Sequence, residues 1–164
     1  MTKTIPTTTT TPKAIFMMGG AGAGKGYVRN RDYAGIPVLD CDAIKEEHPS
    51  YDAKRPQDLH EWSRVELTRR YFAALSTGDS FVYDGTGANA EKYAKLITEA
   101  REAGFEIVLH FVRCDLATAL ERNAKRDRTV PEAIVRDRHA TIEFSFNLIN
   151  PFADVVRVTD NGAK

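Results

Sequence analysis

Cysteine is scarce in this chain, and the shortage limits both its chemistry and its environment. The 164 residues include two cysteines, Cys41 and Cys114, which lie in separate predicted elements without metal-ligand spacing. So few cysteines exclude a disulfide framework and a cysteine-based zinc site. We expect both to be reduced residues of the core in a cytoplasmic protein.

Long apolar runs and net charge are also missing. No apolar run approaches the roughly 20 residues that a membrane-spanning helix needs, so no membrane association is expected. The 23 Lys and Arg residues balance 23 Asp and Glu residues, which gives a formal net charge of zero. This balance provides no overall attraction to nucleic acid or to an anionic membrane, although clustered arginines leave a local basic face open.

What is present suits one globular domain. Hydrophobic residues make up 42% of the chain and charged residues 28%, which is ordinary for a soluble domain with a substantial core. Residues 1–12 are rich in Thr, contain two prolines and lack an apolar stretch. We therefore predict a disordered tail over residues 1–12 and a single domain over residues 13–164.

Predicted strands and helices alternate along this domain. Apolar runs bounded by turn residues predict strands at 14–18, 36–39, 81–83, 105–112 and 155–158. Helical spacing and cap signals predict helices from about residue 25 and at 43–48, 58–76, 90–103, 115–126 and 131–149, with Asp42 capping the second. This order predicts a three-layer α/β fold with a five-stranded parallel sheet, in which ligands gather at the carboxyl ends of the strands.

A glycine-rich loop follows the first predicted strand. Residues 19–26 read Gly-Gly-Ala-Gly-Ala-Gly-Lys-Gly, with five glycines in eight residues, which is more than a flexible turn needs. Glycines let backbone N–H groups point inward, Lys25 adds a mobile positive charge, and the next helix presents its positive N-terminal end. The predicted polyphosphate site consists of Gly19, Gly20, Ala21, Gly22, Ala23, Gly24, Lys25, Gly26 and Tyr27.

One residue type is absent from this loop. A Ser or Thr that ligates magnesium normally follows the lysine, whereas Gly26 and Tyr27 follow it here. We therefore expect Mg²⁺ to be held by carboxylates, waters and the phosphates themselves. An Asn-Lys-x-Asp guanine motif is also missing, since Asn123-Ala124-Lys125 does not supply it, so a GTP switch is disfavoured.

Carboxylates follow the second and third predicted strands. Asp84 ends an apolar strand, where P-loop enzymes place a magnesium-directed carboxylate, although Asp-Gly is also a common turn. Asp40 and Asp42 lie two residues apart at another strand end, and one of them is a candidate general base for an attacking hydroxyl. Helix capping by Asp42 and a two-Asp metal site are the alternatives.

Arginines and aromatic residues complete the set of candidates. Arg122 and Arg126 are spaced i, i+4, and with Arg128 they suit a mobile lid that stabilises charge during phosphoryl transfer, the alternative being a solvated basic face. Arg64 is a candidate contact for an acceptor phosphate. Four aromatic side chains are expected in the core rather than as stacking platforms: Trp62, Phe144, Phe146 and Phe152.

Three segments, in order, resemble the zeta-toxin family of small P-loop kinases. The first is the glycine loop. The second, residues 39–52, contains Asp42-x-x-Lys45-x-x-His48-Pro49 and is similar to that family's acceptor-site Asp-x-x-Lys-x-x-His-Pro segment. The third, Asp84-Gly85-Thr86-Gly87, resembles a Glu-Gly-Thr-Gly run, with Asp in place of Glu. The similarity covers most of residues 14–161.

The resemblance implies roles for individual residues. Asp42 matches the catalytic base, Lys25 the phosphate-binding lysine and Thr86 a residue that touches the acceptor. Arg122 and Arg128 look like the two lid arginines. Within the acceptor segment, Asp40 and Lys45 are further candidates for binding the acceptor.

The resemblance also implies an activity. It is ATP- and Mg²⁺-dependent transfer of the γ-phosphoryl group to a hydroxyl of a nucleotide-containing acceptor, such as 5-hydroxymethyluracil in phage DNA or the sugar of UDP-N-acetylglucosamine. The setting would be the cytoplasm of a bacterial or phage-infected cell, with an inhibitory partner protein as antitoxins are for zeta toxins. The alternatives are a nucleoside monophosphate kinase, which the His48-Pro49 segment disfavours, and a non-catalytic ATP-binding module.

Overall fold

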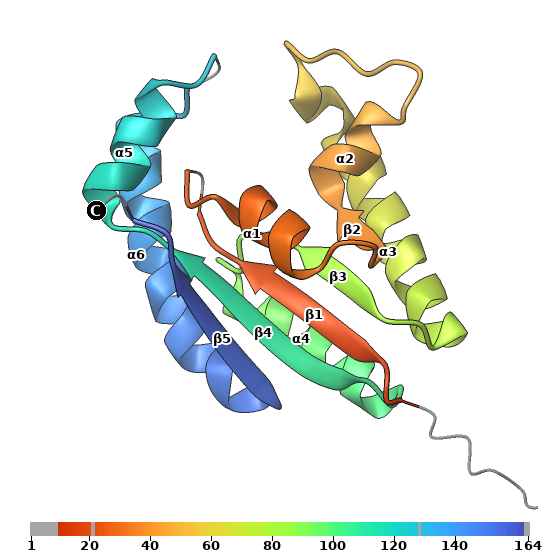
Figure 1. The fold of residues 1–164 in the computed structure, drawn as a ribbon. Helices are drawn as coiled ribbons and strands as arrows, with labels where there is room; N and C mark the ends of the chain where they lie inside the picture. The colour runs from red at the N-terminus through yellow and green to blue at the C-terminus, as the bar shows by residue number, and fades with distance from the viewer. Residues whose placement is uncertain (1–9, 21, 128, 163–164) are drawn as a thin grey trace, which may run out of the picture.

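The computed structural model describes residues 10–162 except 21 and 128, and its centre is a five-stranded parallel sheet (Figure 1). The strands lie in the order β2-β3-β1-β4-β5. They are β1 (Lys13–Met18), β2 (Val38–Asp40), β3 (Phe81–Asp84), β4 (Glu106–Arg113) and β5 (Val155–Asp160). The predicted α/β fold with a five-stranded parallel sheet is confirmed, while the predicted tail lies largely in residues 1–9, outside the described residues.

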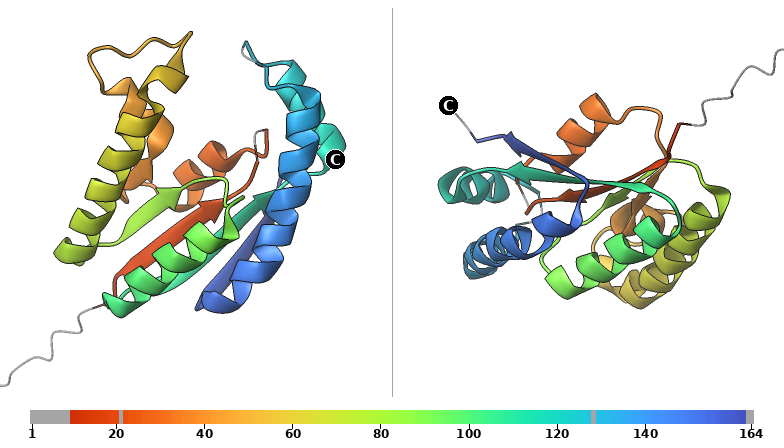
Figure 2. Two further views of the ribbon diagram at one scale, coloured as in Figure 1. Left: turned by 180° about the vertical axis from the view of Figure 1, so that it is seen from behind. Right: turned by 90° about the horizontal axis from the view of Figure 1, so that it is seen from below.

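Helices connect these strands and cover both faces of the sheet. They are α1 (Lys25–Asp32), α2 (Cys41–Glu46), α3 (His60–Thr77), α4 (Ala90–Glu102), α5 (Leu116–Ala124) and α6 (Glu132–Ile149), with short 3₁₀ turns at Pro56–Leu59 and Asn150–Phe152. Figure 2 shows α4 and α6 side by side on the face of the sheet opposite α1. In the described parts of the chain, no helix has both the length and the apolar character needed to span a membrane.

The central strand β1 is buried on both faces, which explains its continuous apolar sequence. Phe16 and Met18 pack into the cluster beneath α4 and α6, whereas Ile15 and Met17 pack into a second cluster beneath α1. All four side chains belong to residues that are at most 1% exposed. A strand covered by helices on both sides needs apolar residues at every position, and that pattern made β1 recognisable in the sequence.

The start of α2 differs from the sequence prediction. The N-cap is Asp40, whose Oδ1 accepts a hydrogen bond from the backbone N–H of Asp42 at 2.9 Å. The prediction that Asp42 caps this helix was therefore wrong by two residues. Strand β2 passes into α2 without an intervening loop, so the last strand residue also serves as the cap.

The aromatic prediction was correct for one of four residues. Phe146 is 7% exposed and its ring lies 4.8 Å from that of Phe111, centroid to centroid. Phe144, Phe152 and Trp62 are instead 66%, 44% and 39% exposed. On α6 the buried stripe runs through Ile142, Phe146 and Ile149, and Phe144 points away from it because two residues turn a helix by about 200°.

The two α6 phenylalanines provide a matched stability test. We expect Phe146→Ala to lower the free energy of unfolding by about 3 kcal/mol because it leaves a cavity beside Phe111. The control Phe144→Ala should change it by less than about 0.5 kcal/mol. Urea unfolding followed by circular dichroism measures both, and equal losses would contradict the assigned packing of α6.

Candidate functional site

The glycine loop joins β1 to α1 at the carboxyl edge of the sheet. Gly22 and Gly24 have φ angles of 81° and 85°, in the left-handed region that favours glycine. A Cβ at Gly22 would lie 3.1 Å from the carbonyl oxygen of Ala119, and one at Gly24 would collide with the side-chain amide of Asn161. These curled residues before a helix N-terminus form a cradle that fits a polyphosphate. Of the predicted loop residues, Ala21 lies outside the described residues.

Two side chains brace the outer side of this loop. The Arg122 guanidinium donates through Nη1 to the carbonyl of Gly22 at 2.8 Å and through Nη2 to that of Asn161 at 2.9 Å. Asn161 in turn donates its side-chain N–H to the carbonyl of Ala23 at 2.8 Å. Arg122, predicted in a lid, thus lies against the loop backbone. Asn161 was not predicted, although its position directly after β5 at the carboxyl edge was a usable signal.

A cleft of about 690 Å³ opens beside the loop, where β2 and β3 end. It contains most of the predicted acceptor-side residues. Its lining consists of Lys25, Gly26, Arg29, Asp40, Cys41, Asp42, His60, Arg64, Leu67, Asp84, Gly85, Thr86, Asn89 and Lys92. The structure thus brings the phosphate-loop lysine, the strand-end carboxylates and Arg64 to one cavity.

Other predicted residues lie away from the cleft lining. Lys45 is buried and reaches the cleft through its ion pair with Asp42, at 3.6 Å. Tyr27 is 67% exposed, with the Arg31 guanidinium 5.8 Å from its ring centre. Arg126 is exposed beyond the last residue of α5. Arg128 lies outside the described residues.

Asp84 lies between two cations at the centre of the site. Its Oδ1 is 3.3 Å from Lys25 Nζ, and its Oδ2 is 2.5 Å from Arg29 Nη1. Lys25 Nζ also donates to the carbonyl of Gly85 at 3.2 Å. Arg29 was not predicted, although its position four residues after Lys25 places both side chains on one face of α1.

The carboxylates differ in their surroundings. Burial raises the pKa of the Asp40 carboxyl above its ordinary value, and the negative charge of Asp84 raises it further. The hydrogen bond from the Asp42 N–H and the charge of Arg29 oppose this shift. The Asp42 side chain, in contrast, is 88% exposed. Asp42 therefore stands where a substrate can reach it, and Asp40 supports the start of α2.

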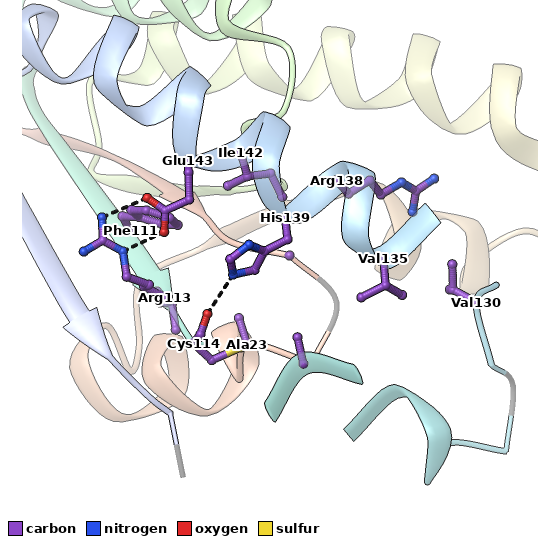
Figure 3. Close-up of a pocket in the computed structure, with 13 residues that line it drawn as sticks. Ala23, Phe111, Arg113, Cys114, Val130, Val135, Arg138, His139, Ile142 and Glu143 are labelled. Atoms are coloured by element: carbon purple, nitrogen blue, oxygen red, sulfur yellow. Dashed lines mark hydrogen bonds and ion pairs between the residues drawn. The ribbon is translucent and has the colours of Figure 1, made fainter. Parts of the chain in front are cut away.

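Two further hollows adjoin the loop and the cleft. A groove of about 400 Å³ between α3 and α4 shares Arg64, Leu67 and Lys92 with the cleft. A smaller cavity of about 30 Å³, lined mainly by apolar side chains, lies among the loop, the end of β4, α5 and α6 (Figure 3). There His139 Nε2 lies 3.0 Å from the carbonyl oxygen of Cys114, which fixes α6 to the end of β4. The cleft, with its many charged groups, suits phosphate chemistry better than this cavity.

The cleft contains carboxylates that could interact with Mg²⁺, but few of them could bind the ion directly. In the described part of the molecule, no three His, Cys, Asp or Glu side chains cluster closely enough to hold a metal ion. Mg²⁺ commonly binds one or two carboxylates and keeps several waters, so Asp84 fits an ion that arrives on a nucleotide. Because Lys25 and Arg29 contact both Asp84 oxygens, that fit is through water.

Comparisons with known proteins bear on the family and the fold of this chain. The family model described as Zeta toxin matches residues 1–164. A chain from the PezAT chromosomal toxin–antitoxin system of Streptococcus pneumoniae is 16% identical, with a TM-score of 0.71, and the match covers 93% of this chain and 69% of that one. None of the curated proteins matches this chain.

Two other solved structures share the fold. One chain of the AvrRxo1-ORF1:-ORF2 structure with ATP is 16% identical with a TM-score of 0.70, over 93% of this chain and 55% of that one. A gluconokinase from Sinorhizobium meliloti is 19% identical with a TM-score of 0.56, over 94% of this chain and 85% of that one. At such identities the likeness shows the fold alone.

The raised pKa of Asp40 gives a test by pH. Because the folded state binds this proton more tightly, its stabilising contribution is present below the unfolded value of 3.8 and is lost as pH rises through the folded pKa. Asp40→Asn preserves the cap but removes the titration. We expect the unfolding free energy of the wild type to fall relative to that of Asp40→Asn over the pH range above the unfolded value of 3.8. Chemical unfolding across this range measures it, and a constant difference would contradict the shift.

Proposed function

The chain belongs to the zeta toxin family of P-loop kinases, and on that premise we propose that it transfers the γ-phosphoryl group of ATP to a hydroxyl of a nucleotide-containing acceptor. The acceptors to test first are UDP-N-acetylglucosamine and DNA containing 5-hydroxymethyluracil. The observation that carries the proposal is the cleft of about 690 Å³, because it holds Lys25 of the phosphate loop and Asp42 together.

The nucleotide would bind at the glycine loop. The positive N-terminal end of α1 would attract its phosphates, and Lys25 supplies a positive charge that can leave Asp84 for the β- and γ-phosphate oxygens. Bound with ATP, Mg²⁺ supplies neutralisation of phosphate charge. Asp84, held in place by Lys25 and Arg29, would orient water molecules in the coordination shell of that ion.

The acceptor hydroxyl would lose its proton to Asp42. The acceptor oxygen then forms a bond to the γ-phosphorus of ATP. The bond between that phosphorus and the oxygen that bridges it to the β-phosphate breaks, and ADP leaves. An exposed carboxylate at the mouth of the cleft can meet an incoming hydroxyl without rearrangement. The Lys45 ammonium lies 3.6 Å from the Asp42 carboxylate. This ion pair would limit the directions in which the Asp42 side chain points.

Arginines would stabilise the charge that spreads over the transferred group. Arg122 already lies beside the loop, with its guanidinium on the carbonyl of Gly22. Arg126 and Arg128 belong to the connection between α5 and α6, and we propose that they approach the phosphates when both substrates are bound. Their roles stay predictions.

The α3–α4 groove favours an acceptor that is anionic and longer than a single sugar. Arg64 and Lys92 line both the cleft and the groove, and Lys95 adds a third positive charge, against Glu61 and Glu99. The floor contains apolar and aromatic side chains, which suits a nucleotide base. This arrangement favours a nucleotide-containing acceptor over an uncharged one. We place the reaction in the cytoplasm of a bacterial or phage-infected cell.

An inhibitory partner protein is part of the proposal. One chain with the same fold comes from a toxin–antitoxin system, and another from a structure with two different chains, AvrRxo1-ORF1 and -ORF2. A kinase with an open, highly charged cleft is a suitable target for such control.

The role of Asp42 can be tested by transfer of labelled phosphate. We expect ATP labelled at the γ-position to label at least one member of a panel of UDP-N-acetylglucosamine, mononucleotides, hydroxymethylated DNA and 5′-hydroxyl oligonucleotides. Asp42→Asn should reduce kcat by about 100-fold or more without changing ATP affinity, because it removes the base. The exposed control Asp79→Asn should react like the wild type.

Two outcomes would count against this proposal. Transfer by Asp42→Asn at the full rate would show that another group takes the proton. Tight ATP binding with no labelled acceptor would favour a non-catalytic ATP-binding module, and labelling of mononucleotides at their phosphates would favour a nucleoside monophosphate kinase.

The groove makes a separate prediction about the acceptor. Arg64→Ala and Lys92→Ala should each raise the KM for an anionic acceptor by about fivefold and leave the KM for ATP unchanged. Each substitution removes one positive charge that would pair with the acceptor at a solvent-accessible site. Arg69→Ala is the matched control, because Arg69 lies on α3 but pairs with Glu66. Steady-state kinetics at two salt concentrations measures these effects, and equal changes for all three variants would exclude a specific acceptor groove.

A further inference from the structure

The position after Lys25 is open. Gly26 stands where the magnesium-ligating Ser or Thr is usual, and a Cβ built there would meet no other atom within 4 Å. Nothing in the fold therefore prevents a larger residue at this site. The next residue on the same face of α1, one turn further along, is Arg29. Its long side chain reaches the carboxylates at the ends of β2 and β3.

The Arg29 guanidinium lies between the two strand-end carboxylates. A single nitrogen, Nη1, is 2.5 Å from Asp84 Oδ2 and 3.4 Å from Asp40 Oδ2. Asp40 and Asp84 are direct neighbours in the parallel register of β2 and β3. Two negative charges held side by side by the sheet require a positive charge between them, and Arg29 supplies it.

Beyond Nη1, the Arg29 guanidinium has a nitrogen without a hydrogen-bond partner in the described part of the chain. Arg29 Nε is buried and makes no hydrogen bond among the described residues. The carboxylates, rather than a full set of hydrogen bonds, therefore fix the position of this side chain. Adjacent carboxylate oxygens are also the ligands that Mg²⁺ and Mn²⁺ prefer, so Arg29 occupies a place suited to a divalent cation.

We infer that Arg29 is a built-in cation that occupies a latent divalent-metal site between Asp40 and Asp84. The free protein then binds no divalent metal at these carboxylates, and Mg²⁺ enters the cleft with the nucleotide. Asp84 is held in position before any metal arrives, which removes the need for a hydroxyl at residue 26. Arg29 is thus a positioning residue that acts through Asp84.

An ordinary structural ion pair would behave differently. If Arg29 serves to attach α1 to the strand ends, its loss lowers stability and creates no affinity for metal. If it takes the place of a metal ion, its loss frees the two Oδ2 atoms that faced it, while Lys25 stays on Asp84 Oδ1, and these two oxygens should bind a metal ion. The two interpretations are separated by metal binding in the absence of nucleotide, which does not depend on phosphoryl transfer or on the proposed acceptor.

The experiment titrates Mn²⁺ alone into the nucleotide-free protein and follows the free ion by electron paramagnetic resonance. Arg29→Gln keeps most of the side-chain length but loses the charge, and we expect it to bind one Mn²⁺ about 10-fold or more tightly than the wild type. Arg29→Lys keeps the charge and should resemble the wild type. Arg29→Gln combined with Asp84→Asn should lose the gain. The control Arg31→Gln removes an α1 arginine that pairs with Asp32, and it should gain nothing.

Each result bears on the inference. A folded Arg29→Gln protein that binds Mn²⁺ no better than the wild type would overturn it. Should Arg29→Gln fail to fold, a wild-type Mn²⁺ site that Asp84→Asn abolishes would still overturn the inference, because Arg29 would then not occupy that place. Absence of kinase activity with a gained Mn²⁺ site would count against the proposed function while supporting this inference.

Discussion

The parallel direction of all five strands is the constraint on which the site depends. Because the strands run the same way, their carboxyl ends meet at one edge of the sheet, and the residues that follow them share a small volume. The glycine loop, Asp40, Asp84 and Asn161 come from four different strand ends. Residues up to 138 positions apart in the sequence, such as Ala23 and Asn161, are brought into contact in this way. This topology brings several carboxylates together at one edge, so cations must lie close to them to balance their charge.

That compensation is local even though the chain as a whole is neutral. Asp84 is almost fully buried and lies between Lys25 and Arg29, and Asp40 shares the second of these cations. A buried carboxylate without such partners would be costly, so the cations stabilise the arrangement before any nucleotide binds. In the proposed function this pairing has a cost, since Lys25 would have to leave Asp84 in order to bind a phosphate. The net charge of the chain says nothing about this balance, which depends on which side chains face the cleft.

Much of the fold could be predicted from the sequence because its signals are short-range. The doubly buried β1 shows as an unbroken apolar run, and the curled loop shows as glycines before a lysine. The misses have physical reasons. Asp40 caps α2 because no loop separates strand from helix, which residue preferences alone do not reveal. Phe144 and Phe146 look equally apolar, and only their angle around α6 separates them. The contacts of Arg29 and of Arg122 depend on side chains from other strand ends, so their partners were not evident from the sequence.

The contact between Asn161 and Ala23 also has a consequence for how the protein matures. The glycine loop after β1 receives part of its outer wall from the residues that follow β5. During synthesis on the ribosome, the loop is therefore made early but braced late. Affinity for nucleotide should emerge only when β5 has paired with β4. A chain in which β5 has not yet paired would then compete poorly for cellular ATP, because the outer wall of the loop would still be missing.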